Sequence, residues 1–267
     1  MDTLAIAGVG LIGGSFALAI RRAGFQGRIV GVSSPKTIET ALTRGVIDEG
    51  LPLEEAAAVA DLIYLAQPIA QILRTLDAIG VHVKPAALVT DAGSTKRVIC
   101  ARAGMSIQQA RFIGGHPMAG KESRGVEHAD AGLFEGRPYI LTSRDSVLED
   151  WITKIGAKLV FLSPAKHDRL VALASHLPQM LSTALGSALA DEPDAAQVAG
   201  PGAMDMTRLA MSSYEIWHDI LATNAEPIEA ALDVVIGKLE ELRASLRSTE
   251  MEKEFERASK AAQALRS

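Results

Sequence analysis

Short apolar segments recur along the first half of the chain, separated by longer helix-like segments. The apolar segments lie at 3–7, 28–32, 61–65, 87–91, 111–114 and 138–142. Apolar strands that alternate with helices, such as 12–23 and 68–79, indicate a parallel sheet covered on both faces. We therefore expect residues 1–162 to form an α/β domain with a doubly wound sheet.

The pattern changes where Ser163 and Pro164 suit the N-cap and the first position of a helix. No convincing strand follows. Residues 167–190 are apolar on more than one side, which is typical of a helix buried on several faces, and residues 226–266 suggest one or two exposed amphipathic helices. Because one copy of so small a region offers little surface to bury such a helix, we expect residues 163–267 to form an all-α dimerisation domain. The alternative is a monomeric bundle.

The stretch GVGLIGGS carries the spacing Gly8-x-Gly10-x-x-Gly13 directly after a strand and at the start of a helix. That context, rather than the spacing alone, indicates a dinucleotide-binding Rossmann domain. Gly8 permits the tight turn, Gly10 lets a pyrophosphate approach the backbone, and Gly13 lets the helix pack against the strand. Leu11 and Ile12 lie at the positive end of the helix dipole, where the phosphate binds. A plain glycine-rich turn is the alternative.

The end of the second strand bears on the choice between NAD and NADP. An NAD site carries Asp or Glu at this point to bind the ribose hydroxyls. This chain has Ser33 there, followed by Ser34, and Lys36 lies close by. A carboxylate would repel the 2'-phosphate of NADP, whereas two hydroxyls and a lysine accept it, so the sequence favours NADP. No arginine lies at the usual place, and Ser34 before Pro35 also suits a helix cap.

Three polar stretches each follow directly after a predicted strand. They are AQPI with Gln67 and Pro68, DAGSTK with Ser94, and GGHPMAGKE with His116. Ligands of doubly wound sheets lie outside the carboxyl ends of the strands. We therefore expect all three stretches to converge on the nicotinamide.

Histidine is the side chain most easily poised as a base near neutral pH, so we expect His116 to take a proton from a substrate hydroxyl as hydride leaves to the cofactor. The Ser94 hydroxyl is a candidate to hydrogen-bond both His116 and the reacting oxygen. A structural histidine on a tight Gly-Pro turn is the alternative. His176 is a candidate for facing the cleft. Surface or local packing roles are expected for His82, His128, His167 and His218. No pair has metal-ligand spacing, so we expect no metal site.

Arg208 lies inside the apolar run TRLAM, in a short span that also holds Asp205 and Trp217. A dehydrogenase that acts on a carboxylate substrate needs a fixed cation, and arginine offers two parallel donors. Arg208 is therefore the candidate for binding a substrate carboxylate. A structural arginine paired with Asp205 fits the spacing equally well.

The composition narrows the possible partners. The net charge is −5 and no cluster of Lys and Arg stands out, which argues against a nucleic-acid partner. Cys100 is the only cysteine, so the chain has no intrachain disulfide. No apolar stretch is long enough to span a membrane, and a strand begins almost directly after Met1, without room for a targeting segment. We therefore expect a cytoplasmic protein.

Taken together, these motifs resemble the prephenate/arogenate (cyclohexadienyl) dehydrogenase family of tyrosine biosynthesis. The stretches that carry the resemblance follow the family's order and spacing over nearly the whole chain: GVGLIGGS, DAGSTK, GGHPMAGKE, HADAGLFEGRPYILT, HLPQ, and DMTRLA followed by Trp217. The resemblance implies a Rossmann domain, an all-helical dimerisation domain and an active site in the cleft between them. It also implies oxidative decarboxylation of prephenate, arogenate or both: hydride leaves the carbon that bears the hydroxyl, carbon dioxide leaves, and the ring becomes aromatic.

The resemblance also implies roles for individual residues. His116 matches the catalytic histidine that bonds the substrate hydroxyl, and Ser94 matches the serine that orients both. Arg208 matches the arginine that binds a substrate carboxylate. Glu122 and Asp205 match two acidic partners of this arginine, and Asp205 is able to reach across from the other subunit. His176 matches a cleft residue that contacts the substrate side chain.

Two other classes of protein fit parts of the sequence. A different Rossmann-plus-helical dehydrogenase, of the β-hydroxyacid or imine-reducing kind, would act through a lysine or lack a histidine at the strand end. The GGHPMAG stretch argues against it. A non-catalytic NADP-binding sensor would keep the glycine loop but would not need Ser94, His116 and Arg208 together. Many family members carry an acidic residue where this chain has Ser33, so NAD remains the alternative cofactor.

Overall fold

The first part of the chain is built on a six-stranded parallel sheet, in a computed structural model that describes residues 1–266. The spatial order of the strands is β3-β2-β1-β4-β5-β6. Their bounds are β1 Thr3–Ala7, β2 Arg28–Val32, β3 Glu49–Gly50, β4 Leu62–Leu65, β5 Leu88–Asp91 and β6 Arg111–Ile113. This is the strand order of a doubly wound Rossmann sheet, so the predicted fold class is confirmed.

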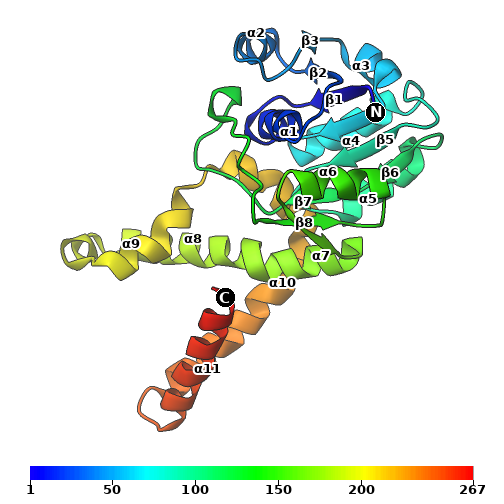
Figure 1. Cartoon of the computed structure of the whole chain (residues 1–267). Helices are drawn as coiled ribbons and strands as arrows, with labels where there is room; N and C mark the ends of the chain where they lie inside the picture. Colours follow the sequence, from blue (N-terminus) through cyan, green and yellow to red (C-terminus); the bar gives the residue numbers. More distant parts are fainter. Residues whose placement is uncertain (267) are drawn as a thin grey trace.

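Five helices connect these strands and cover both faces of the sheet (Figure 1). They are α1 Leu11–Arg22, α2 Pro35–Thr43, α3 Leu53–Val59, α4 Ile69–Ile79 and α5 Arg97–Ser106. On one face α1 and α2 bury residues such as Phe16 and Ala41, and on the other α3, α4 and α5 bury residues such as Ile72 and Ile99. With both faces closed, ligands reach the sheet only along its edges and strand ends.

A second sheet of three strands lies beside the first. It consists of β7 Gly115–Pro117, β8 Pro138–Leu141 and β9 Lys158–Phe161, in that order. β7 runs antiparallel to β8, whereas β9 runs parallel to β8 and follows α6 (Ser146–Lys154). The expectation that segment 138–142 joins the parallel sheet is therefore wrong, because an apolar pattern identifies a strand but not its partner or direction.

The step between the two sheets depends on Gly115. A Cβ atom on this residue would lie 2.5 Å from the carbonyl oxygen of Asp91 and 3.1 Å from Oγ1 of Thr90, so only glycine lets β7 pass so close to β5. The segment 111–114, expected as one strand, is accordingly followed at once by a new one. His116 is the central residue of that new strand, β7.

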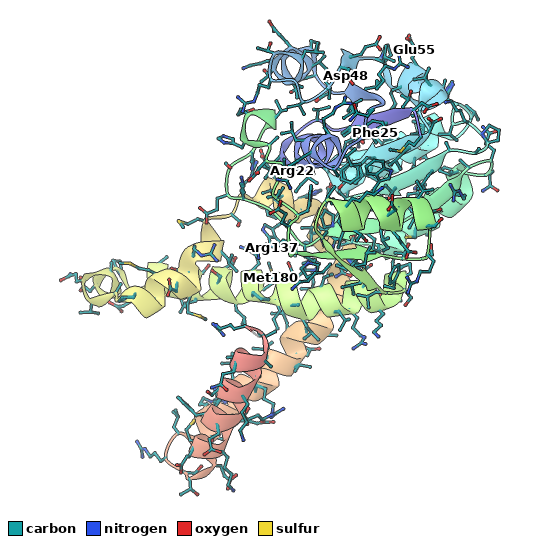
Figure 2. All side chains as sticks on the ribbon, viewed as in Figure 1. Arg22, Phe25, Asp48, Glu55, Arg137 and Met180 are labelled. Carbon is teal, nitrogen blue, oxygen red and sulfur yellow. The ribbon has the colours of Figure 1, made fainter. Side chains whose placement is uncertain are left out.

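Aromatic side chains join the two sheets into one core. Phe16 on α1 stacks on Tyr64 of β4 with ring centroids 3.9 Å apart. The buried hydroxyl of Tyr139 on β8 donates to the hydroxyl of Tyr64 at 3.2 Å. Phe25, marked in Figure 2, meets Trp151 of α6 edge-on. The small sheet is therefore held in place by the same packing that supports α1.

The second part of the chain contains helices only, as far as residue 266. They are α7 Pro164–Val171, a π-helical turn Ala172–His176, α8 Leu177–Ala190, a 3-10 turn Pro193–Val198, α9 Pro201–Thr207, a 3-10 turn Arg208–Met211, α10 Tyr214–Ser245 and α11 Glu250–Ala264. The hydroxyl of Ser163 caps α7 by accepting from the Lys166 amide, as the sequence predicts. None of the helices described is long and apolar enough to cross a membrane.

The helical region packs on the α4–α5 face of the parallel sheet. Ala172, Leu177, Ile220 and Ile228 share one buried cluster with residues of α3, α4 and α5. Beyond this contact, α8 with α9 and the hairpin of α10 with α11 extend from the body as two arms (Figure 1). The arms leave a large helical surface open to solvent in a single chain.

Removing the Phe16 ring should destabilise the fold strongly, because Phe16 is fully buried against Tyr64. We expect Phe16→Ala to lower the free energy of unfolding by about 3–5 kcal/mol. Leu42→Ala, at a 43% exposed position on α2, is the control and should change it by less than about 0.5 kcal/mol. Urea unfolding followed by circular dichroism measures both. Equal losses in the two variants would contradict this account of the core.

Candidate active site

A hollow of about 630 Å³ lies beyond the carboxyl ends of β1 and β2. The glycine loop, the start of α2 and the segment before α4 line it. The predicted cofactor-binding residues that it brings together are Gly8, Gly10, Ser33, Ser34, Lys36, Gln67 and Pro68. These residues come from three separate stretches of sequence, which the fold brings together at this edge of the sheet.

The glycine loop has the shape that a pyrophosphate requires. Gly8 has a φ of +94°, and a Cβ atom there would lie 2.5 Å from the Ala66 carbonyl oxygen. A Cβ atom on Gly13 would lie 2.1 Å from the Gly8 carbonyl oxygen, whereas Gly10 faces open space. No side chain caps the N-terminus of α1, so its free N–H groups are available to an anion. The loop therefore fits the phosphates of a dinucleotide.

The part of this hollow beside α2 is rich in hydroxyl groups and holds one lysine. Ser33, Ser34 and Lys36 are exposed, and Lys36 forms no ion pair within the described residues. The hydroxyl of Ser34 also accepts from the Thr37 amide at 3.3 Å, so Ser34 is a helix cap as well as a wall of the hollow. Glu127 adds one carboxylate to the lining of the same hollow.

A second cleft of about 520 Å³ continues from the first across Gln67 and Pro68. The Thr75 hydroxyl donates to Oε1 of Gln67 at 2.8 Å and fixes that side chain. Asp219 of α10 accepts from the Ala70 amide at 2.8 Å, which holds α10 against the start of α4. The cleft therefore lies between the Rossmann and helical regions. Its walls include the predicted residues Leu11, Ile12 and Ser94.

A third hollow, of about 710 Å³, extends the groove toward α9 and α10. Arg208 and Glu122 lie on its walls, with Nη1 of Arg208 3.3 Å from a carboxylate oxygen of Glu122. Both side chains are more than half exposed, so the arginine remains open to a ligand. Asp205 on α9 makes no side-chain hydrogen bond or ion pair with any described residue. Within one chain the partner of Arg208 is thus Glu122 and not Asp205.

His116 is bonded to a second histidine. Its Nδ1 lies 2.8 Å from Nε2 of His167 on α7, and Nδ1 of His167 lies 2.7 Å from Oδ1 of Asp168. The Asp168 carboxylate also accepts from the backbone N–H groups of Lys96 at 2.6 Å and Arg97 at 2.9 Å. All three side chains are buried, with only 8% of His116 exposed. The chain His116–His167–Asp168 joins β7 of one domain to α7 of the other.

The order of these bonds fixes the proton on His116. The Asp168 carboxylate can only accept, so His167 donates from Nδ1 and accepts at Nε2 from Nδ1 of His116. Nε2 of His116 is then unprotonated and has no partner among the described residues. Burial, reinforced by charges on His167, Lys96 and His176, holds the pKa of His116 well below 6.5. At neutral pH this nitrogen is a base.

His176 lies behind the cleft rather than on its wall. It is 1% exposed, its Nδ1 accepts from the Asn224 amide at 3.1 Å, and its ring meets Trp217 edge-on at 5.8 Å. Burial lowers the pKa of His176 to about 4. Asn224 also donates to the carbonyl oxygen of Asp168 at 2.9 Å. The expectation that His176 faces the cleft is therefore wrong for the single chain.

Sequence reasoning assigned the wrong role to His167 and overlooked Asp168. His167 was expected to serve surface or local packing, but it is fully buried and is the bonded partner of His116. The Ser94 hydroxyl, expected as that partner, lines the cleft without a bond to His116. The one available signal was position, since His167 and Asp168 lie in the first helix of the second domain, shortly after its start at Pro164. Among the described residues, no group of three or more His, Cys, Asp and Glu side chains could hold a metal ion.

A Rossmann sheet with this glycine loop, joined to a helical region across a groove, defines the class of two-domain dinucleotide-binding proteins. A family model described as "Prephenate dehydrogenase, nucleotide-binding domain" matches residues 16–161, and one described as "Prephenate dehydrogenase, dimerization domain" matches residues 163–260. The prephenate dehydrogenase of Lactococcus lactis subsp. cremoris is 36% identical over 233 residues, which are 85% of this chain and 66% of that protein. The chain belongs to the prephenate dehydrogenase family.

Two solved structures of the same architecture are similar over nearly their whole length. Prephenate dehydrogenase from A. aeolicus, in complex with hydroxyphenyl propionate and NAD+, has a TM-score of 0.92 and 30% identity, covering 99% of this chain and 98% of that one. Synechocystis arogenate dehydrogenase has a TM-score of 0.86 and 31% identity, covering 98% and 99%. The arrangement of the two domains is therefore shared with both.

The glycine loop provides a direct test of nucleotide binding. Gly13→Ala places a methyl group 2.1 Å from the Gly8 carbonyl oxygen, so the loop must move away from α1. We expect the dissociation constant for the dinucleotide to rise by about tenfold or more, which is about 1.4 kcal/mol. Isothermal titration calorimetry measures this change.

The matched control for Gly13→Ala is Gly104→Ala on α5. A Cβ atom at Gly104 has no heavy atom within 4 Å, so nucleotide affinity should stay unchanged while the helix gains about 0.5–1 kcal/mol. Unchanged affinity in Gly13→Ala would show that the nucleotide does not bind at this loop.

Proposed function

We propose that the protein catalyses the oxidative decarboxylation of prephenate, arogenate or both, with hydride transfer to a nicotinamide cofactor. The observation that carries the proposal is the buried chain His116–His167–Asp168, which leaves Nε2 of His116 as an unprotonated base without a partner among the described residues. The substrate class comes from the relatives, one of which is a prephenate dehydrogenase with bound NAD+ and hydroxyphenyl propionate and another an arogenate dehydrogenase.

The cofactor would be held by the first hollow and the adjoining cleft. Gly8, Gly10 and the N-terminus of α1 fit the pyrophosphate, as the steric test of the loop indicates. Gln67 and Pro68 lie where the hollow and the cleft meet, and Leu11, Ile12 and Ser94 line the next part of the groove. When bound there, the nicotinamide supplies the acceptor for the hydride.

His116 supplies the acid–base chemistry. Its Nε2 atom takes the proton of the substrate hydroxyl while the carbon that bears this hydroxyl loses its hydride. The electrons of the bond to the ring carboxylate then enter the ring, carbon dioxide leaves, and His116 returns the proton to the oxygen of the new phenol. During this cycle His167 and the Asp168 carboxylate stabilise the transient positive charge on His116.

Other side chains orient the substrate. We assign Arg208 to a substrate carboxylate, because its guanidinium is open to the third hollow and is held by Glu122 at 3.3 Å. Ser94, half-buried in the cleft and without a side-chain hydrogen bond to any described residue, is assigned to the substrate hydroxyl beside His116. His176 is assigned to support the wall of the cleft near the substrate side chain. Asp205 is assigned to an interaction with the second subunit.

The cofactor we favour is NADP. Its 2'-phosphate would bind Ser33, Ser34 and Lys36, because this end of the hollow offers hydroxyl groups and an ammonium that pairs with no carboxylate of residues 1–266. The Glu127 carboxylate, which lines the same hollow, is negatively charged like the 2'-phosphate and argues for NAD. Lys36 sits beside the two serines on the α2 side, where the ribose lies in this fold.

We further propose a cytoplasmic homodimer formed through the helical region. In one chain only Leu177, Gln179 and Ser182 of α8 are buried, although the helix is apolar on several sides. The family model that matches this region is described as a dimerization domain. A second copy would cover the faces that one chain leaves open.

A four-way steady-state assay tests the activity and the cofactor. We expect turnover with prephenate or arogenate, and kcat/KM about tenfold or more higher with NADP than with NAD, since bonds to a charged phosphate contribute about 1.5–3 kcal/mol. The absorbance of reduced nicotinamide follows the reaction. No turnover in any combination would refute the function, and a higher kcat/KM with NAD would refute only the cofactor assignment.

Two variants test whether the cofactor preference depends on a charge placed in the hollow or on added negative charge anywhere on α2. Ser33→Asp places a carboxylate where the 2'-phosphate would bind and should shift the preference toward NAD. Thr43→Asp adds the same charge at the exposed far end of α2 and should leave the preference unchanged. An identical shift in both would assign the effect to net charge alone.

The pH profile tests the role of His116. Because burial lowers its pKa well below 6.5, Nε2 stays unprotonated down to that pH, and kcat/KM should fall only at lower pH, as protons bind. His116→Asn should lower kcat by about 10²–10⁴-fold while the nucleotide still binds. His82→Asn, at an exposed histidine, is the control. Half-maximal activity above pH 6.5 would contradict the assigned base.

A further inference from the structure

One buried carboxylate bonds to both loops that carry the proposed reacting residues. Asp91, the last residue of β5, accepts from the Gly93 amide at 2.8 Å through Oδ2 and from the Gly115 amide at 3.1 Å through Oδ1. Gly93 directly precedes Ser94, and Gly115 directly precedes His116. The two oxygens of one side chain thus set the distance between the two loops.

Lys96 closes this arrangement into a ring. Its ammonium forms a buried ion pair with Oδ2 of Asp91, and both side chains are 0% exposed. The backbone N–H of the same lysine donates to Asp168 at 2.6 Å, and Asp168 leads through His167 to His116. His116 is therefore connected to residues 91–97 twice: through the backbone of its own strand, at Gly115, and through its imidazole, by way of His167 and Asp168.

Stability alone does not account for such a pair. Taking a carboxylate and an ammonium out of water costs about as much as their attraction returns, and an apolar pair of similar size often serves equally well. The Asp91–Lys96 pair instead provides two directed acceptors for backbone N–H groups and one fixed charge. Neither residue is among those that line the cleft or the two hollows.

We propose that Asp91 and Lys96 are positioning residues that hold Ser94 and His116 in their reacting arrangement. This inference rests on the proposed function, in which Ser94 and His116 meet at the substrate hydroxyl. Misplacement of a reacting group by about 1 Å is enough to lower a rate about a hundredfold. Loss of the Asp91–Lys96 pair should therefore lower kcat and leave nucleotide binding unchanged.

Lys96 also adds charge near His116. The other titratable groups around that ring are His167 and His176, with Asp168 beyond His167. Burial is the main reason for the low pKa of His116, and the Lys96 ammonium lowers it further. Removing this cation should therefore raise the pKa of His116, a change that a merely structural residue would not produce.

The experiment compares three variants with a matched control. Asp91→Asn leaves one N–H without its acceptor, Lys96→Met removes the cation, and the double variant removes both charges so that no unpaired charge remains to prevent folding. The control is Asp61→Asn at the opposite end of the sheet. Asp61 likewise accepts from two backbone N–H groups, of Asp2 and Thr3, and pairs with Lys84 at 2.8 Å.

We expect Asp91→Asn and the double variant to lose about tenfold or more in kcat, with the nucleotide dissociation constant unchanged. Asp61→Asn should lower only the melting temperature. Wild-type kcat in the double variant, or a kcat loss in Asp61→Asn equal to that in Asp91→Asn, would overturn the proposal.

A second measurement does not depend on turnover. Titration of ¹³Cε1-labelled histidine by NMR should show a higher pKa for His116 in Lys96→Met and an unchanged one in Asp61→Asn. An unchanged pKa in Lys96→Met would overturn the positioning proposal. Inactivity of the wild-type protein on both substrates would instead refute the proposed function, so the two failures are distinguishable.

Discussion

The Asp168 carboxylate joins the Rossmann domain to the helical domain at the point where both meet His116. One oxygen accepts from His167 and from the Lys96 amide, and the other accepts from the Arg97 amide. A fully buried carboxylate is tolerable only with several donors, and burial alone would raise its pKa, which these bonds instead lower. The start of α5, the start of α7 and the position of β7 therefore depend on one another. The direction in which His116 points is a consequence of domain packing.

Much of the fold follows from local patterns. All strands of the parallel sheet except β3, and the helices α1 and α4, lie within a residue or two of the predicted segments, because both faces of the sheet are covered and these strands are largely apolar. β3 was not predicted, because its two residues, Glu49 and Gly50, carry no apolar pattern. The pattern failed where tertiary geometry decides. Segment 138–142 is a strand, but it pairs with β7 and β9 in the second sheet, which begins at Gly115. β9 was missed because none of its residues is buried.

The candidate site, like the fold, was predictable from the sequence only in part. The glycine loop was predictable because all its requirements lie within a few residues that share one turn. The partner of His116 was not, since His167 is 51 positions away and its role depends on how α7 docks. The serine near the same strand ends was a closer candidate in sequence than His167, yet it lines the cleft without bonding the histidine. Sequence position identifies which residues reach an edge of the sheet, and only packing decides which of them bond.

The groove changes in character along its length. Its first hollow lies at the carboxyl ends of a largely buried sheet, whereas its far end, at Arg208, lies on the exposed connection between α9 and α10. Met204 and Met206 of α9 and Met211 in that connection are more than half exposed, which is unusual for large apolar side chains on the surface of a monomeric protein. Covering them with a second copy, as proposed, would exclude water around Arg208 and strengthen its attraction for a carboxylate. Dimerisation and substrate binding would then be two results of the same burial, and the single chain would hold the cofactor site complete but the substrate site open on one side.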